Sequence, residues 1–273
     1  MAAPHIVFGM HVTKRPGPGA GALVAWGNAW LAGHVGLDEA VDAVEKVAGP
    51  CVLRGVPTQE EIPLRRGLGE LRVEGMTGLR LALPIPGDPL GLTGPPALNT
   101  AAIEAGAAVL ADLDGRCRGL LPAEDRRGSS YLGVRWTLLE ARPGRPGLPS
   151  LAEADHQLTL AVREVTEALL GVDDVSGKRP DPEIMQTLAA LRESQAGESQ
   201  DGLAPGYPPR AHRVAALAGR LTVVVELARA LDGRNLTADQ MRRRADALAT
   251  LDRAVRRARV AAHNSAFDPV NRP

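Results

Sequence analysis

The stretch from Pro209 to His263, PRAHRVAALAGRLTVVVELARALDGRNLTADQMRRRADALATLDRAVRRARVAAH, determines the fold of this chain more firmly than any other. Apolar residues recur in both of its halves at steps of three and four, which is the spacing of one helix face. They are Val214, Leu217, Leu221, Val224, Val225 and Ala228, then Met241, Ala245, Leu248, Val255, Ala258 and Ala262. Asp232-Gly233-Arg234-Asn235 lies between the halves and is typical of a turn. The stretch predicts an antiparallel αα-hairpin of Pro209–Leu231 and Thr237–His263.

Two capping boxes mark where helices begin in this half of the chain. Thr237 precedes Gln240 by three residues, and Ser150 precedes Glu153 by three. In each pair the hydroxyl accepts from the third helical N–H while the longer side chain reaches back. The Ser150 box predicts a helix that runs to Leu170.

Asp181-Pro182 adds an N-cap followed by proline at the first helical position, which predicts a helix to about Gln195. With the hairpin, these helices predict an all-α bundle over residues 150–265. Arg142–Pro149 alternates proline and glycine and is interpreted as the domain boundary.

The first 145 residues show a different pattern, of short apolar runs separated by turns. Helices are predicted at Leu37–Ala48 and Leu98–Ala105. Strands are predicted at Ile6–Val12, Ala22–Ala32, Cys51–Val56, Leu68–Val73, Leu79–Leu83, Ala107–Leu110, Arg118–Leu121 and Tyr131–Arg142. For Ala22–Ala32 a helix remains the alternative, because Trp26 and Trp30 share a face in either structure. A hairpin is expected to join Leu68–Val73 to Leu79–Leu83. The chain is therefore assigned to the α+β class, with a mainly antiparallel N-terminal sheet and a C-terminal helical domain.

Composition excludes several classes of protein. The formal net charge is zero, so no overall field attracts nucleic acid or an anionic membrane. The two cysteines, Cys51 and Cys117, are too few for a disulfide framework or a thiolate zinc site. Met1–His11 lacks the basic start of a signal peptide, and no stretch is long enough to span a bilayer. We expect a soluble cytoplasmic protein with no cofactor, no metal site and no membrane.

Candidate catalytic residues occur in Ala107-Ala108-Val109-Leu110-Ala111-Asp112-Leu113-Asp114-Gly115. This segment resembles the first motif of haloacid-dehalogenase-type phosphatases, where one Asp is the nucleophile and the second is the acid/base beside Mg²⁺. Arg116 stands where that motif has Thr, and no later lysine or acidic pair follows a strand. The competing interpretation is an Asp-Gly turn that closes a hairpin. The motif makes Asp112 and Asp114 weak candidates.

Candidate ligand-binding residues lie in the glycine-rich stretch near the N-terminus, which could cradle a phosphate through backbone N–H groups. They are Lys14, Arg15, Gly17, Gly19 and Gly21. The stretch lacks the Gly-Lys-Ser/Thr of a P-loop, so a surface loop is the favoured interpretation.

Arginines gather toward the C-terminus. Residues 210–260 contain 12 arginines and 5 acidic residues, whereas residues 150–209 contain 11 acidic and 4 basic residues. The balances, +7 and −7, are equal and opposite, so we expect pairing within the chain. Aromatic residues for base stacking are lacking as well, which makes nucleic acid an unlikely partner.

One loop carries a resemblance. Pro84-Ile85-Pro86-Gly87-Asp88-Pro89-Leu90-Gly91-Leu92, with the segment Asn99 to Gly106, resembles uncharacterised conserved proteins of high-GC bacteria. The resemblance implies no activity, cofactor or site residue.

Three functions remain as hypotheses. The first is a non-catalytic intracellular binding or assembly protein, whose helical half mediates self-association or docks a protein partner. The second is a Mg²⁺-dependent phosphatase around Asp112 and Asp114. The third is a nucleic-acid accessory protein that uses the arginine-rich last helix.

Overall fold

The computed structural model describes residues 19–55, 60–128, 131–144, 147–170, 202–230 and 237–267. The predicted strand Ile6–Val12, the predicted helix from Asp181 and the turn Asp232–Asn235 lie outside these residues.

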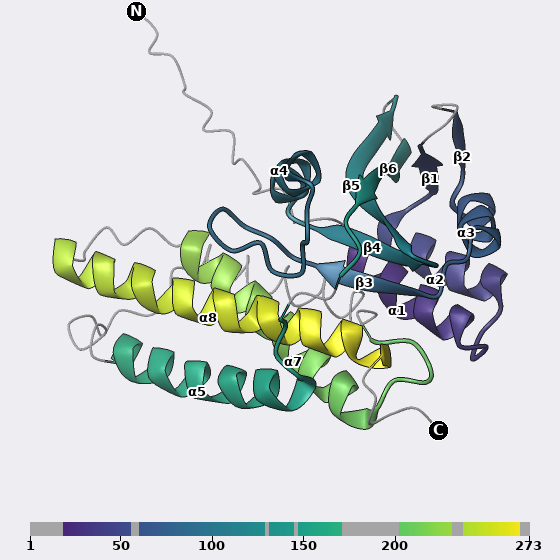
Figure 1. Ribbon diagram of the computed structural model, residues 1–273. Helices are drawn as coiled ribbons and strands as arrows, with labels where there is room; N and C mark the ends of the chain where they lie inside the picture. Colours follow the sequence, from purple (N-terminus) through teal and green to yellow (C-terminus); the bar gives the residue numbers. More distant parts are fainter. Residues whose placement is uncertain are drawn as a thin grey trace, which may run out of the picture.

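The described residues form a six-stranded sheet and helices on both sides of it (Figure 1). The helices are α1 (Ala20–Leu31), α2 (Leu37–Ala48), α3 (Leu64–Val73), α4 (Pro96–Ala105), α5 (Leu151–Leu170), α7 (Pro209–Ala230), α8 (Ala238–Asn264) and the 3₁₀ helix η1 (Ser265–Phe267). The strands are β1 (Cys51–Arg54), β2 (Glu61–Pro63), β3 (Gly78–Ala82), β4 (Ala108–Leu113), β5 (Arg116–Arg127) and β6 (Tyr131–Ala141). A mixed α and β architecture is therefore confirmed.

The sheet has the strand order β2-β1-β6-β5-β4-β3. Every neighbouring pair is antiparallel except β1 and β6, which are parallel. The prediction of a mainly antiparallel sheet is confirmed. β3 is an edge strand, so one row of its backbone N–H and C=O groups faces away from the sheet.

Alternation along the strands separates two buried clusters. On β4, Val109 and Ala111 belong to the cluster that also holds the apolar residues of α1, α2 and α3, whereas Leu110 packs with α4 on the opposite face. A third cluster joins α5, α7 and α8, and it includes Ala25 and Ala29 of α1. α1 is therefore packed between the sheet and the helical half of the chain.

The strand favoured for Ala22–Ala32 was wrong, because this segment is helix α1. Contact with both neighbours buries α1 on nearly all sides, so it has no polar stripe to reveal a helical period. A Cβ added to Gly27 would lie only 2.4 Å from Leu79 Cδ1 of β3. Glycine at this position therefore lets α1 pack closely against β3. The alternative that the Trp26 and Trp30 spacing left open is the correct one.

The hairpin expected between Leu68–Val73 and Leu79–Leu83 was also wrong. Residues 64–73 form α3, whose buried residues Leu64, Gly67, Leu68 and Leu71 have helical spacing. The antiparallel partner of β3 is β4 instead, with Gly78 opposite Asp112 and Ala82 opposite Ala108.

Beyond residue 150, the described residues are helical or lie in short connections. α5, α7 and α8 agree with the predicted helices, and both capping boxes are confirmed. Glu153 N–H donates to Ser150 Oγ at 3.3 Å while Ser150 N–H donates to Glu153 Oε2 at 2.8 Å. Thr237 and Gln240 make the same reciprocal bonds at the start of α8.

A Thr237→Ala variant is expected to lose about 1 kcal/mol of unfolding free energy, because the Gln240 N–H loses its acceptor. Urea unfolding of the full chain measures the loss. Thr166→Ala is the matched control, since Thr166 lies inside α5 and donates to the Val162 carbonyl of the same helix. Equal stability of the parent and the Thr237 variant would contradict the role of the cap.

Candidate functional site

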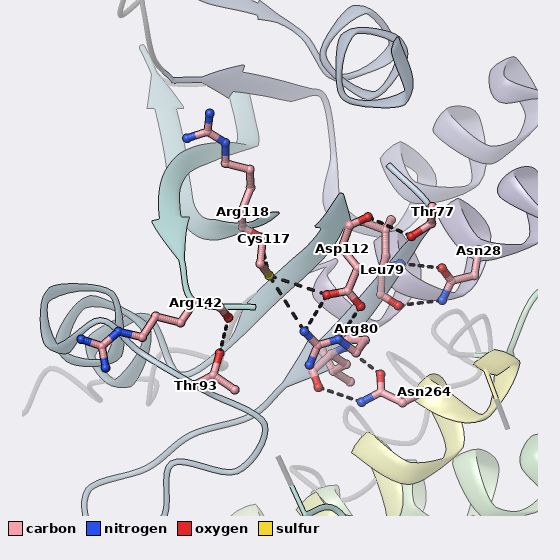
Figure 2. Close-up of polar contacts among 11 residues, drawn as sticks. Asn28, Thr77, Leu79, Arg80, Thr93, Asp112, Cys117, Arg118, Arg142 and Asn264 are labelled. Carbon is pink, nitrogen blue, oxygen red and sulfur yellow. Dashed lines mark hydrogen bonds and ion pairs between the residues drawn. The ribbon is translucent and has the colours of Figure 1, made fainter. Parts of the chain in front are cut away.

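Asp112 lies near the end of β4 and is bound by an arginine from the neighbouring strand β3. Arg80 donates from Nε to Asp112 Oδ2 and from Nη2 to Oδ1, each at 2.7 Å (Figure 2). The Arg80 side chain is only 7% exposed and that of Asp112 is 28% exposed. Burial alone would lower the pKa of Arg80, but the hydrogen bonds and charge of Asp112 outweigh it and raise that pKa. Both carboxylate oxygens are thus engaged in a bidentate ion pair.

Cys117 on β5 completes this group. Its Sγ lies 3.7 Å from Asp112 Oδ1 and 3.9 Å from Arg80 Nη2. Burial, followed by the charge of Asp112, raises the pKa of the Cys117 thiol to about 11. A thiol with this pKa is protonated at neutral pH and is a poor nucleophile.

Asp114 occupies a different position from the one that a phosphatase motif requires. It lies with Gly115 in the two-residue turn between β4 and β5, and Gly115 has a φ of +67°. β4 is antiparallel to both of its neighbours. The hairpin interpretation of Asp114-Gly115 agrees with this geometry, although Asp112 bonds Arg80 rather than local backbone. In the described part of the chain, no three His, Cys, Asp or Glu residues could hold a metal ion together.

The glycine-rich stretch is described only from Gly19 onward, so Lys14, Arg15 and Gly17 lie outside the described residues. Gly19 precedes α1 with a φ of +81°. A Cβ there would lie 2.6 Å from Ala48 Cβ, and one on Gly21 would lie 2.7 Å from His263 Nε2. These two glycines therefore allow α1 to approach α2 and α8 closely, a packing role that the sequence did not reveal.

Two asparagines bind the open edge of the sheet, and neither was a predicted site residue. Asn28 of α1 accepts from Leu79 N–H and donates to Leu79 O, both at 2.8 Å. Asn264 of α8 makes the same pair of bonds with Leu81, at 2.7 and 3.1 Å (Figure 2). Each amide occupies the place that a neighbouring strand would take, so β3 is protected from pairing with another chain.

A second polar contact joins the loop after β3 to α8. Arg256 is buried and donates to Leu83 O at 2.9 Å, to Asp88 Oδ2 at 3.0 Å and to Asp252 Oδ2 at 3.3 Å. Asp88 belongs to the Pro- and Gly-rich loop on which the resemblance rests. Burial would raise the pKa of Asp88, but Arg256, the Leu90 N–H and Arg257 together lower it.

The other arginines of the last two helices pair with acids of both α5 and α8, and the acidic residues from 171 to 201 lie outside the described residues. Arg210 bonds Asp155 of α5 at 2.9 Å, as the opposite charge balances predicted. In contrast, Arg243 and Arg229 pair with Asp239 and Asp252, both on α8. Helical spacing of four residues explains the Arg243–Asp239 pair, and the packing of α7 on α8 explains the Arg229–Asp252 pair.

A cavity of about 220 Å³ lies beside α3. Its lining includes Glu60, Glu70 and Glu74, but Glu70 is paired with Arg66 at 2.8 Å, and Leu53, Ile62, Leu71 and Leu138 also line it. It is smaller than a typical small-molecule pocket and contains no nucleophile–base pair.

A groove of about 320 Å³ runs between α5 and α8 on the outside of the helical half. Four residues of each helix line it, at steps of three, four and seven. They are Gln157, Leu160, Ala161 and Glu164 of α5, and Thr250, Arg253, Ala254 and Arg257 of α8. Leu160 is 41% exposed in this groove. None of these residues was predicted as a site residue from the sequence. Leu160, an apolar residue away from the main apolar stripe of α5, could have indicated this groove.

Among the described residues, no helix has the length and apolar character to cross a membrane.

Comparison with known proteins gives a consistent result. A family model described as "Rv1486c-like protein, N-terminal domain" matches residues 20–150, and its C-terminal counterpart matches residues 152–260. The "Uncharacterized protein Rv1486c" of Mycobacterium tuberculosis strain H37Rv is 27% identical, covering 88% of this chain and 94% of that protein. The "Uncharacterized protein MT1533" of strain CDC 1551 is 28% identical with the same coverage. No solved structure matches.

The resemblance to uncharacterised conserved proteins of high-GC bacteria is thus confirmed. The two family models together span nearly all of the described residues, from the start of α1 to residue 260 in the last part of α8. This chain belongs to the family of Rv1486c-like proteins.

Proposed function

We propose that this chain is a non-catalytic binding and assembly protein, and that its helical half self-associates through the groove between α5 and α8. The observation that carries the proposal is the groove itself. It has a half-exposed leucine at its centre and small residues, Ala161 and Ala254, in its walls. Such a surface suits packing against a second pair of helices, as in a four-helix bundle.

The polar groups elsewhere support a non-catalytic function. Arg80 and Asp112 neutralise each other, and Cys117 is a protonated thiol. Asn28 and Asn264 are occupied by the backbone of β3. The described residues therefore hold their conspicuous polar side chains in contacts that stabilise the fold. The phosphatase hypothesis needs a carboxylate that is available to attack, so it is less well supported.

We also propose that residues 150–265 form one all-α bundle and that the protein is cytoplasmic. α8 packs against both α5 and α7, which supports the bundle. Cys51 and Cys117 are buried free thiols, which fits a reducing compartment.

The mass of the full chain in solution tests the assembly function. Light scattering during size-exclusion chromatography should give a multiple of 28.7 kDa at micromolar concentrations. A Leu160→Glu variant should return to 28.7 kDa, because a buried, unpaired carboxylate disfavours the assembled state.

Val73→Glu is the matched control, since Val73 is 89% exposed at the end of α3, away from the groove. It should leave the mass of the assembly unchanged. Circular dichroism confirms that both variants are folded. A parent chain that stays at 28.7 kDa at every concentration would refute the proposed function.

A further inference from the structure

We infer that the groove between α5 and α8 receives a second copy of this chain, across a two-fold axis that runs along the groove. In this dimer α5 of each copy lies against α8 of the other. The inference rests on the proposed function, and it specifies the occupant and the orientation of its helices.

The arrangement of the lining residues supports this orientation. α5 and α8 run antiparallel, as the direction of the colour along each helix shows (Figure 1). A rotation about an axis along the groove keeps each helix direction and exchanges the two sides. Each helix would then have antiparallel neighbours, as in an up-and-down four-helix bundle. Leu160 of both copies would meet near the axis, beside Ala161 and Ala254.

Charge complementarity selects this axis over one perpendicular to the helices. Glu164 lines the groove from α5, and Arg253 lines it from α8. A perpendicular two-fold axis would lay α5 on α5 and α8 on α8, and so bring like charges together. The axis along the groove instead places Glu164 close to Arg253 of the partner subunit, twice in each dimer.

The groove also contains two charged groups that form no ion pair with the described residues of the same copy. They are Glu164 on α5 and Arg253 on α8. The partner subunit would supply the opposite charge for each of them.

Charge reversal of the full chain tests the orientation. Glu164→Arg and Arg253→Glu should each weaken homodimerisation on the order of ten- to a hundred-fold, because two contacts change from attraction to repulsion. An equimolar mixture of the two variants should form mainly a heterodimer, since one copy then carries only positive groups at these sites and the other only negative ones. The double variant should dimerise like the parent. Native mass spectrometry of differently tagged chains counts each species.

Arg163→Glu is the control, because Arg163 is exposed on α5 but does not line the groove. Single variants that dimerise like the parent, together with a statistical mixture, would overturn the inferred orientation. If Leu160→Glu still abolishes dimers in that case, the proposed function stands. A parent chain that is monomeric would refute both.

Discussion

An Asp112→Ala variant is expected to lose about 3 kcal/mol of unfolding free energy, the lower end of the range for breaking a buried ion pair. The substitution removes both acceptors of Arg80, whose side chain is 7% exposed, and leaves its guanidinium charged inside the sheet. The lower end applies because Asp112 itself is 28% exposed, so water can reach part of the site.

Urea unfolding of the full chain measures this loss. Asp114→Ala is the matched control, because Asp114 is an exposed turn residue two positions away. This variant should lose less than about 0.5 kcal/mol of unfolding free energy. The double variant Arg80→Leu, Asp112→Leu should recover most of the stability, since apolar residues often replace a buried pair without loss. If the Asp112 variant matched the Asp114 variant, the ion pair would not stabilise the fold.

That Asp112 is not a nucleophile stays a prediction. Phosphoester turnover with Mg²⁺ that disappears in a folded Asp112→Asn variant would reverse it. The pairing with Arg80 makes this outcome unexpected, because each oxygen of Asp112 that could attack phosphorus is held by a hydrogen bond from a buried arginine.

Sequence patterns predicted the elements that have one exposed face. α2, α5 and α8 each carry polar residues opposite an apolar stripe, and the capping boxes of α5 and α8 mark their first residues. The antiparallel arrangement of β4, β5 and β6 followed from short apolar runs and turn residues. In these cases the local sequence and the packing favour the same structure.

Patterns failed where packing on several sides removes the contrast between faces. Nine of the twelve residues of α1 are buried, so its sequence indicates that the segment is buried but does not show the helical spacing of apolar residues. α3 contains Gly67 and Gly69, which disfavour a helix locally. Gly67 is needed there because a Cβ would lie 2.3 Å from Leu53 Cδ2 of β1. Tertiary packing thus outweighs intrinsic propensity in both helices.

The polar contacts could not be predicted because they join residues far apart in the chain. Asn264 is 183 positions from Leu81, and Arg256 is 168 positions from Asp88. Nothing near either residue distinguishes it from any other polar side chain on a helix. Their roles follow only from the contact of α8 with β3 and with the loop that comes after it.

An Arg256→Met variant is expected to lose about 3 kcal/mol of unfolding free energy, because it removes the buried cation that joins α8 to this loop. The Leu83 carbonyl would lose the Arg256 donor, and Asp88 would keep only the Leu90 N–H and the more distant Arg257. Arg242→Met is the matched control, because Arg242 is exposed near the start of α8, and it should change stability by less than about 0.5 kcal/mol.

The same contact predicts a dependence on pH. In the folded chain Arg256, the Leu90 N–H and Arg257 overcome the effect of burial and lower the pKa of Asp88, whereas an unfolded Asp titrates near 3.9. The stabilisation is therefore complete above about pH 4 and is lost as the pH falls through the lower pKa of the folded state. Urea unfolding between about pH 5 and pH 2.5 should show a steeper loss of stability for the parent than for Arg256→Met. Parallel profiles for the two proteins would mean that Arg256 does not hold Asp88 in its charged form, and that the loop is attached to α8 by apolar packing alone.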